Sequence, residues 1–152
     1  MKKQLNARQV SLRHGRGVTL MELMVVVAIL SIVATIAVPS YRRYLIRSNR
    51  VEAKIALLQL QTAQEKFYMQ NNAFTADLTG ASPDGLGLLA TTETGKYTIE
   101  VDVPADGQSF SATATPAAGG GQQDDSECAT FSINERGTRG VTGPQGAQAC
   151  WR

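Results

Sequence analysis

The sequence predicts an α+β fold in which one long N-terminal helix packs on a small antiparallel sheet. An apolar run from Val18 to Val38 carries only one charged residue, Glu22. A helical repeat of apolar positions then continues to about residue 71, and short segments of alternating apolar and polar residues follow it. We find no internal repeat and no second domain in the 152 residues.

The apolar run is long enough to cross a membrane. About 20 apolar residues in a helix span roughly 30 Å of hydrocarbon, so we predict a transmembrane helix over residues 18–38. Glu22 lies only a few residues inside this run. An acid near the centre of a membrane helix costs roughly 2.5–3.5 kcal/mol on insertion scales, so its presence here indicates a function.

The helix is expected to continue beyond the membrane with a kink at Pro39, because proline removes a backbone donor and clashes with the preceding turn. The pattern after Pro39 is amphipathic, and we expect its apolar stripe to pack against the rest of the domain. The helix should end near Gln70–Asn72. The apolar stripe contains Tyr44, Val51, Ile55, Leu58 and Thr62, and the neighbouring polar stripe contains Arg43, Arg47, Arg50, Lys54, Gln61 and Glu65.

The rest of the chain is predicted to contain a loop and up to four strands. Residues 73–95 are interrupted by glycine and proline and should be mostly loop. Alternation predicts strands at 96–103 and 109–115, which form a hairpin. A third strand is expected at 128–134 and a short fourth at 138–142. The Gly-rich segment from Pro116 to Asp125 is expected to be a flexible connection.

The formal net charge of +2 hides an uneven distribution. Five of the fifteen basic residues lie in the first 17 positions, which contain no acid, so ten basic and thirteen acidic residues remain, a balance near −3. The remaining chain is not strongly basic, so its charge does not suggest nucleic acid as the main partner. His14, the only histidine, also lies in this segment. Without it the chain has no histidine base and no histidine metal ligand, so we predict no enzyme, no metal and no cofactor.

The first 17 residues do not resemble an ordinary secretory signal, which places its small-residue cleavage site after the apolar segment. Here the candidate site, Gly17, comes before that segment, so cleavage would leave the helix in the mature protein. A glycine permits close approach of a protease to the backbone. An uncleaved single-span anchor is the alternative.

Cys128 and Cys150 are the only cysteines. A pair in a small exported domain is most simply a disulfide, with two free thiols as the alternative. The positive-inside bias is weak because arginines follow the apolar run as well as precede it. The cysteines therefore favour a C-terminal domain outside the cytoplasm.

The N-terminal sequence resembles the class III prepilin signal of type IV pilins and type II secretion pseudopilins. That signal consists of a basic leader ending in glycine, here Gly17, a hydrophobic first mature residue, here Val18, and an acid at the fifth mature position, here Glu22. Val18 stands where phenylalanine is usual. Pro39-Ser40-Tyr41 closes the apolar run as it does in many type IV pilins. Further motifs look like those of PilE-like minor pilins: 47–54, 64–68, 71–75, 128–133 and Cys150-Trp151. The resemblance implies a pilin-like fold with a cleaved leader (1–17), a filament-core helix (18–38) and a periplasmic head (39–152) that includes the amphipathic helix to about 71.

The resemblance also implies a structural subunit of a type IV pilus, serving pilus assembly and pilus-dependent motility or adhesion. Prepilin peptidase would cleave after Gly17 and N-methylate Val18. Glu22 would pair with the terminal amine of a neighbouring subunit, whereas a snorkelling or protonated carboxylate is the alternative. The implied partners are other pilin subunits, the peptidase, the inner-membrane assembly machinery and, before assembly, inner-membrane lipid. The protein would move from the inner membrane to an extracellular pilus.

A type II secretion pseudopilin and a DNA-binding pilin for DNA uptake are the alternative functions. Asp124, Asp125 and Glu127 offer oxygen ligands for calcium, but their spacing matches no defined calcium loop and favours a solvated turn. Arg136 and Arg139 are a weak signal for DNA phosphate contacts. Finally, Arg42, Arg43, Arg47 and Arg50 would either meet lipid headgroups and acids of other subunits or form a solvated helix face.

Overall fold

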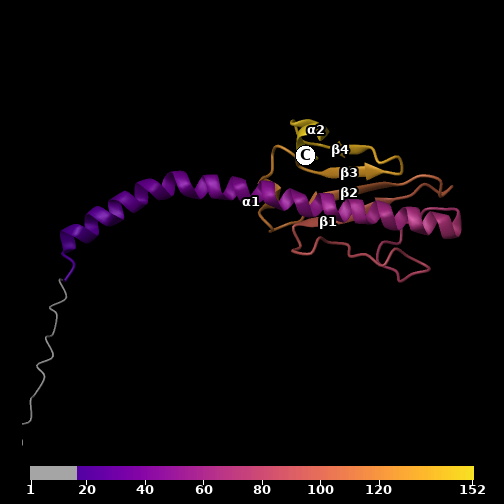
Figure 1. Ribbon diagram of the computed structural model, residues 1–152, viewed down its shortest axis with the longest axis horizontal. Helices are drawn as coiled ribbons and strands as arrows, with labels where there is room; N and C mark the ends of the chain where they lie inside the picture. Colours follow the sequence, from indigo (N-terminus) through magenta and orange to yellow (C-terminus); the bar gives the residue numbers. More distant parts are fainter. Residues whose placement is uncertain (1–16) are drawn as a thin grey trace, which may run out of the picture. The chain divides into compact units, whose positions relative to one another are not determined.

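The computed structural model describes residues 17–152, so the expectations for residues 1–16 lie outside the described residues. The chain divides into two compact units after Pro39. Helix α1 (Leu20–Asn71) contributes to both units, and Pro39 lies inside it (Figure 1). The helix therefore continues through the proline, while the predicted kink stays a prediction.

The second unit contains one four-stranded sheet, and the predicted α+β fold is confirmed. Its strands follow the order β1-β2-β3-β4, and every neighbouring pair is antiparallel. Two short helices lie after β2 and β4: η1 (Gln122–Asp124) and α2 (Gly146–Cys150). The strands are β1 (Tyr97–Asp102), β2 (Ser111–Pro116), β3 (Phe131–Asn134) and β4 (Arg139–Val141).

The local sequence explains where α1 begins and ends. The Glu22 N–H donates to Thr19 Oγ1 at 3.2 Å, so Thr19 caps the first turn. At the other end Asn72 adopts a left-handed conformation (φ 52°), and its N–H donates to the Tyr68 carbonyl. Asparagine accepts this conformation more readily than most residues, which suits it to stop a helix. The predicted end near residues 70–72 is confirmed.

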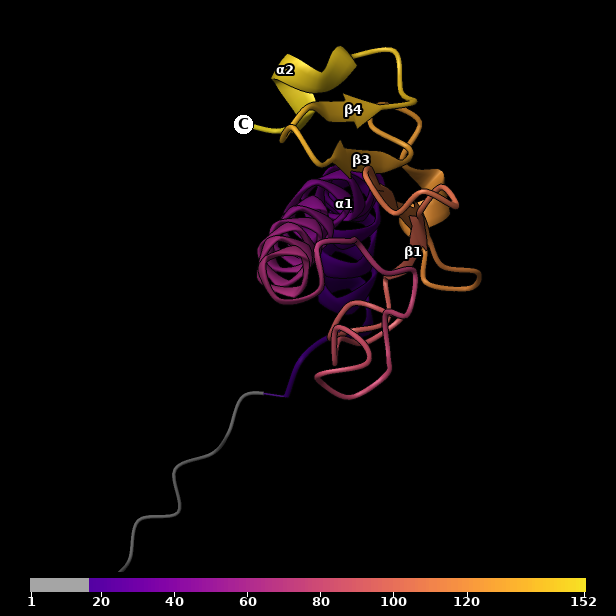
Figure 2. The same cartoon turned by 90° about the vertical axis from the view of Figure 1, so that its right-hand side faces the viewer.

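The core forms between the head half of α1 and one face of the sheet (Figure 2). Alternation places every second strand residue on that face, as predicted for half-buried strands. The loop 73–95 lies beside β1, where Thr91 bridges to Thr98. The buried apolar residues are Ala53, Leu57, Leu60, Leu78, Tyr97, Ile99, Phe110, Ala112, Ala114, Cys128, Phe131, Ile133 and Cys150.

The predicted packing face of α1 is wrong. The buried positions of the helix are Arg50, Ala53, Leu57, Leu60 and Gln64, which recur at steps of three and four. This stripe overlaps the predicted polar stripe. The polar residues of this stripe can be buried because each forms hydrogen bonds inside the head. Gln64, for example, exchanges hydrogen bonds with the backbone of Thr75 at 2.6 and 3.2 Å. The predicted apolar stripe instead faces outward.

The Gly-rich segment before β3 is also more ordered than predicted. It contains η1, and Gln122 and Asp125 are both buried. The short helix α2 was not predicted at all. It packs on β4, and the Trp151 indole N–H donates to the Gly140 carbonyl at 3.1 Å. These elements carry no strong periodic signal because they are only three and five residues long.

Candidate functional site

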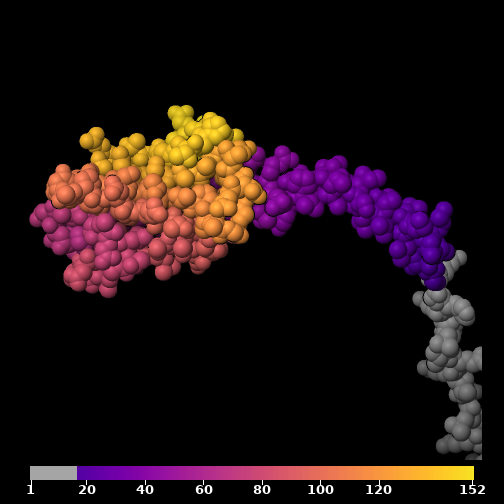
Figure 3. Space-filling model, turned by 180° about the vertical axis from the view of Figure 1, so that it is seen from behind, coloured from indigo at the N-terminus to yellow at the C-terminus, as the bar shows by residue number. Residues whose placement is uncertain are grey.

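The N-terminal half of α1 is an apolar surface without cover. Every residue from Gly17 to Leu45 is exposed, and an 18-residue window of α1 reaches a mean hydropathy of 2.6 with none of it buried (Figure 3). By length and composition this helix can cross a membrane. Such a surface is stable only in lipid or against other apolar helices, because exposure to water would cost free energy over its whole area.

Glu22 lies in the first turn of α1, three residues after the cap at Thr19. An acid at this position is favoured by the positive end of the helix dipole, and Thr-x-x-Glu is the sequence of a capping box. The structure thus supplies a local reason for the acid that the hydropathy pattern did not reveal. Gly17 and Val18 precede the helix, so a peptide bond between them is accessible to a protease.

The head half of α1 carries a second uncovered apolar surface, which we call the outer stripe (Tyr44, Val51, Ile55 and Leu58). The exposed fractions of these residues are 68%, 47%, 51% and 39%. Part of the outer stripe lines a shallow apolar hollow of about 460 Å³. The stripe does not contribute to the fold of its own head, so its apolar character requires another explanation.

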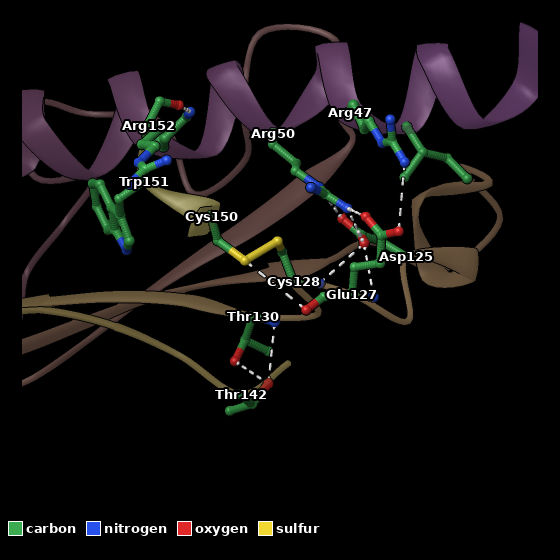
Figure 4. The surroundings of a disulfide bond; sticks show 12 residues. Arg47, Arg50, Asp125, Glu127, Cys128, Thr130, Thr142, Cys150, Trp151 and Arg152 are labelled. Carbon is green, nitrogen blue, oxygen red and sulfur yellow. Dashed lines mark hydrogen bonds and ion pairs between the residues drawn. A yellow bond between two sulfur atoms is a disulfide. The ribbon is translucent and has the colours of Figure 1, made fainter. Parts of the chain in front are cut away.

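A buried ion cluster joins α1 to the segment after η1 (Figure 4). Arg50 contacts Asp125 through two hydrogen bonds of 2.7 Å and Glu127 through one of 2.8 Å. Only 10% of the Arg50 side chain and 1% of the Asp125 side chain are exposed. Two weaker pairs flank the cluster at the surface, Arg47–Glu127 and Arg42–Asp124.

The expected solvated turn is wrong at Asp125, which is buried, whereas Asp124 is exposed as expected and Glu127 is half-buried. All three acids pair with arginines of the same chain. Arg50 was expected either to meet lipid headgroups and acids of other subunits or to lie on a solvated helix face. Both expectations are wrong for this residue, because it is buried. Within residues 17–152 no group of three or more acids, cysteines or histidines is placed to hold a metal ion.

Gln122 extends this cluster into a buried polar network. Its side-chain amide donates to the Ile46 carbonyl at 3.0 Å and to the Tyr97 hydroxyl at 2.8 Å, while its oxygen accepts from Asn49 at 3.1 Å. Buried polar groups are costly when unpaired and specify one arrangement when all are satisfied. The network thus fixes the register of η1 against α1.

The cluster shifts the protonation of its members. Hydrogen bonding to Asp125 raises the pKa of Arg50. Burial alone would raise the pKa of Asp125, but hydrogen bonds from Arg50 and from the Cys128 N–H hold it below its ordinary value. The hydrogen bond from Arg50 also lowers the pKa of Glu127. Both acids are therefore ionised at neutral pH.

Cys128 and Cys150 are joined by a disulfide, with 5.8 Å between their Cα atoms. The bond ties α2 to the strand segment that follows the ion cluster, and the Cys128 N–H donates to Asp125 at 3.1 Å (Figure 4). Phe131 and Trp151 pack edge to face next to it, with ring centroids 5.8 Å apart. Disulfide, aromatic pair and ion cluster therefore hold the C-terminal segment together.

Sequence profiles of two protein families match the chain. The profile described as type IV minor pilin ComP, DNA uptake sequence receptor, matches residues 39–132. The profile described as the prokaryotic N-terminal methylation motif matches residues 12–38. Together they cover the apolar run, the amphipathic helix and most of the sheet.

Several curated proteins are similar to the chain in sequence. They include the type IV major pilin protein PilA of Myxococcus xanthus, 42% identical over 73 residues, which are 47% of this chain and 33% of that protein. The fimbrial protein EcpC of Eikenella corrodens is 37% identical over 66% of this chain and 61% of its own length. The chain thus spans one third to about three fifths of the length of these relatives.

A solved structure of a type IV pilin from Shewanella oneidensis also resembles the chain. It superimposes with a TM-score of 0.45 at 24% identity, over 62% of this chain and 89% of that one.

Proposed function

The chain belongs to the type IV pilin family matched by the ComP profile, and we propose that it is a minor pilin made as a precursor and built into a type IV pilus. The observation that carries this proposal is the uncovered apolar surface of α1 before Pro39. The outer stripe is a second uncovered apolar surface, on the head half of the same helix. In a soluble monomer this apolar surface would stay exposed to water, whereas a bundle of like helices would bury it.

We propose that prepilin peptidase cuts after Gly17 and that Val18 becomes the N-methylated terminus. The match to the N-terminal methylation motif supports this processing. The precursor is anchored in the inner membrane by residues 18–38 with its head in the periplasm. The disulfide supports this orientation, because disulfides persist in oxidising compartments.

Assembly exchanges one apolar environment for another. The helix leaves the lipid and enters a bundle of neighbouring helices, so its apolar surface stays covered throughout. The outer stripe adds the head half of α1 to the same bundle. The family suggests that the whole filament serves adhesion and motility. It also suggests that an inner-membrane assembly machinery drives the transfer of the helix from lipid to filament.

Glu22 acts as the register residue of this bundle. The terminal amine of a neighbouring Val18 neutralises it in the apolar core, where an unpaired carboxylate is costly. Its place in the first turn also stabilises the helix end. Glu22→Gln removes the charge and keeps a side chain suited to a capping box, so it separates these two effects.

The processing test is the intact mass of the protein extracted from membranes. The expected mass begins at Val18 and includes one added methyl group. A chain that still begins at Met1, or that is cut after the apolar run, contradicts the proposal.

The assembly test is the fraction of mature protein in sheared pili relative to the membrane. Glu22→Gln should be inserted and cleaved normally but enter pili poorly, because the neighbouring amine is left unpaired in a medium of low dielectric constant. Thr19→Ala is the matched control, since it removes the cap without touching the charge. Equal pilus fractions for wild type and Glu22→Gln contradict the role of Glu22.

DNA binding is a second candidate function, and the description of the matching family as a DNA uptake sequence receptor favours it. Arg136 and Arg139 are both exposed and lie on or next to β4. Binding of the protein to duplex DNA should then weaken steeply as salt rises, because phosphate contacts release counterions. Absence of binding at low salt excludes this function.

A further inference from the structure

A small hollow with both signs of charge lies beside the ion cluster, between α1 and the segment after η1. Its volume is about 150 Å³. We call it the charged hollow, and its charged lining residues are Arg43, Arg47, Arg50, Asp124, Asp125 and Glu127. Three of them, Arg50, Asp125 and Glu127, are joined to one another by hydrogen bonds of 2.7–2.8 Å (Figure 4). The groups that remain available to a ligand are therefore the more exposed ones.

These exposed groups are two cations and an acid, and they are only weakly paired. Arg43 is exposed and forms no ion pair within residues 17–152. Arg47 lies 3.6 Å from Glu127, and Asp124 lies 3.7 Å from Arg42. The exposed fractions of the Arg47 and Asp124 side chains are 61% and 65%. Exposed ion pairs of this kind contribute little free energy, so a ligand can replace them at small cost.

The charged hollow belongs to the part of the head that follows the proposed membrane span most closely in the chain. Arg43 comes five positions after residue 38 in α1, which is about 8 Å at 1.5 Å per residue. Headgroups extend roughly 5–7 Å beyond the hydrocarbon on each side of a bilayer, and arginine side chains are long enough to reach them. Tyr41 and Tyr44 are 62% and 68% exposed on the same stretch, and tyrosine favours this interface. A lipid headgroup is therefore the charged ligand that anchoring brings to the hollow.

We propose that the charged hollow binds a zwitterionic headgroup with a primary ammonium, that of phosphatidylethanolamine. This inference rests on the proposed function, because anchoring by residues 18–38 brings the hollow to the membrane surface. The phosphate accepts hydrogen bonds from Arg43 and Arg47, since guanidinium groups pair well with phosphate. The ammonium donates to the Asp124 carboxylate. The contact holds the head at the membrane surface before assembly.

The two signs of charge in the hollow distinguish this lipid from other phospholipids. The headgroup of phosphatidylglycerol also offers a phosphate to the arginines, but it brings a net negative charge next to Asp124 without a cation to offset it. The nitrogen of phosphatidylcholine is positive but trimethylated, so it has no N–H to donate. A primary ammonium has three N–H donors. Only the ethanolamine headgroup therefore satisfies both the arginines and the acid.

The test measures which lipid stays bound to the mature full-length protein. The protein in a neutral detergent is mixed with equal amounts of phosphatidylethanolamine, phosphatidylglycerol and phosphatidylcholine that carry identical acyl chains. Native mass spectrometry then counts the retained lipids. Wild type should retain phosphatidylethanolamine several-fold more than either other lipid. Arg43→Ala should lower this retention about fivefold, which corresponds to the loss of one basic residue near a charged membrane surface.

Asp124→Asn is the decisive variant, because it removes the acid and keeps the arginines. It should abolish the preference for phosphatidylethanolamine over phosphatidylcholine without lowering retention of phosphatidylglycerol. Arg43 and Asp124 are both exposed, so neither change should unfold the head. Arg136→Ala is the matched control, since it removes an exposed arginine that lies outside the charged hollow, and it should leave lipid retention unchanged.

Equal retention of the three lipids by wild type overturns the inference. A preference of wild type for phosphatidylglycerol also overturns it, because the arginines then act as an ordinary basic patch. Membrane insertion and pilus incorporation are measured separately, by carbonate extraction and in sheared pili. A protein that is inserted and enters pili without the lipid preference refutes only this site, whereas one that retains phosphatidylethanolamine but never enters pili refutes the proposed function.

Discussion

Arg50 shows how a charge is accommodated inside this head. Burial of a guanidinium costs several kcal/mol unless its hydrogen bonds are replaced. Here Asp125 binds it through two hydrogen bonds and Glu127 through a third. Asp125 in turn accepts from the N–H groups of Glu127 and Cys128. The cluster is therefore satisfied as a whole, and removing one member leaves the others buried and unpaired.

Arg50→Met should lower the free energy of unfolding by about 3 kcal/mol, because Asp125 keeps its charge in a buried site without its partner. Arg43→Met is the matched control, since Arg43 is exposed and belongs to the same helix. Its effect should stay within about 0.5 kcal/mol. Urea unfolding of the detergent-solubilised protein measures both, and equal values for the two variants would refute the cluster's role.

The pKa of Asp125 is lower in the folded state than in the unfolded chain. Its contribution to stability is therefore fully present above the unfolded pKa, about 3.9, and is lost as pH falls through the folded pKa. Asp125→Asn should be less stable than wild type at neutral pH, and the difference should shrink below about pH 4. Unfolding curves across this range provide the measurement, and a difference independent of pH contradicts the linkage.

At the scale of elements, α1 combines two surfaces in one 52-residue helix. One stripe of its head half packs in the core, and the outer stripe stays uncovered. The difference is sharp at two adjacent leucines: Leu57 is 0% exposed and Leu58 is 39% exposed. Consecutive residues of a helix point about 100° apart. Leu57 therefore packs in the core of the head, while Leu58 is available for the proposed contacts in the filament.

Alanine variants of these two leucines should differ in stability. Leu57→Ala should destabilise the head by about 2–5 kcal/mol, since it leaves a cavity in the core. Leu58→Ala should change the free energy of unfolding by less than about 1 kcal/mol but reduce the fraction of protein in sheared pili. The two variants delete the same atoms, so each is the control of the other. If Leu58→Ala is destabilised as much as Leu57→Ala, the assignment of the two faces is wrong.

At the scale of the whole molecule, the disulfide joins residues separated by 22 positions. Closing such a loop restricts the unfolded chain and stabilises the fold by roughly 3 kcal/mol. The loop contains β3, β4 and most of α2, including the segment that carries Arg136 and Arg139. The bond therefore constrains the segment that contains the edge strand β4.

Cys128→Ser should accordingly lower head stability by about 3 kcal/mol without reducing insertion into the membrane, because the proposed transmembrane residues belong to the other unit. Urea unfolding and carbonate extraction measure the two effects. Alkylation of the unfolded, unreduced wild type should label no thiol, and two labelled cysteines would contradict the bond in the cell.

The parts of this protein that depend on local patterns can be predicted from its sequence. The apolar run, the length of α1 and the alternation of the strands each follow from the spacing of residue types, because helix and strand geometry act over neighbouring positions. The cysteine pair and the prepilin-like N-terminus were also visible. Cleavage after Gly17, methylation of Val18 and the pairing of Glu22 stay predictions.

Which face of α1 is buried depends on contacts between distant parts of the chain. Apolar content pointed to the outer stripe, yet the core formed on the side where Arg50 and Gln64 find partners 75 and 11 residues away in the chain. The same holds for Asp125 and Gln122, whose partners lie on α1. Periodicity reports the character of a face, but the burial of a polar side chain depends on the distant group that satisfies its hydrogen bonds.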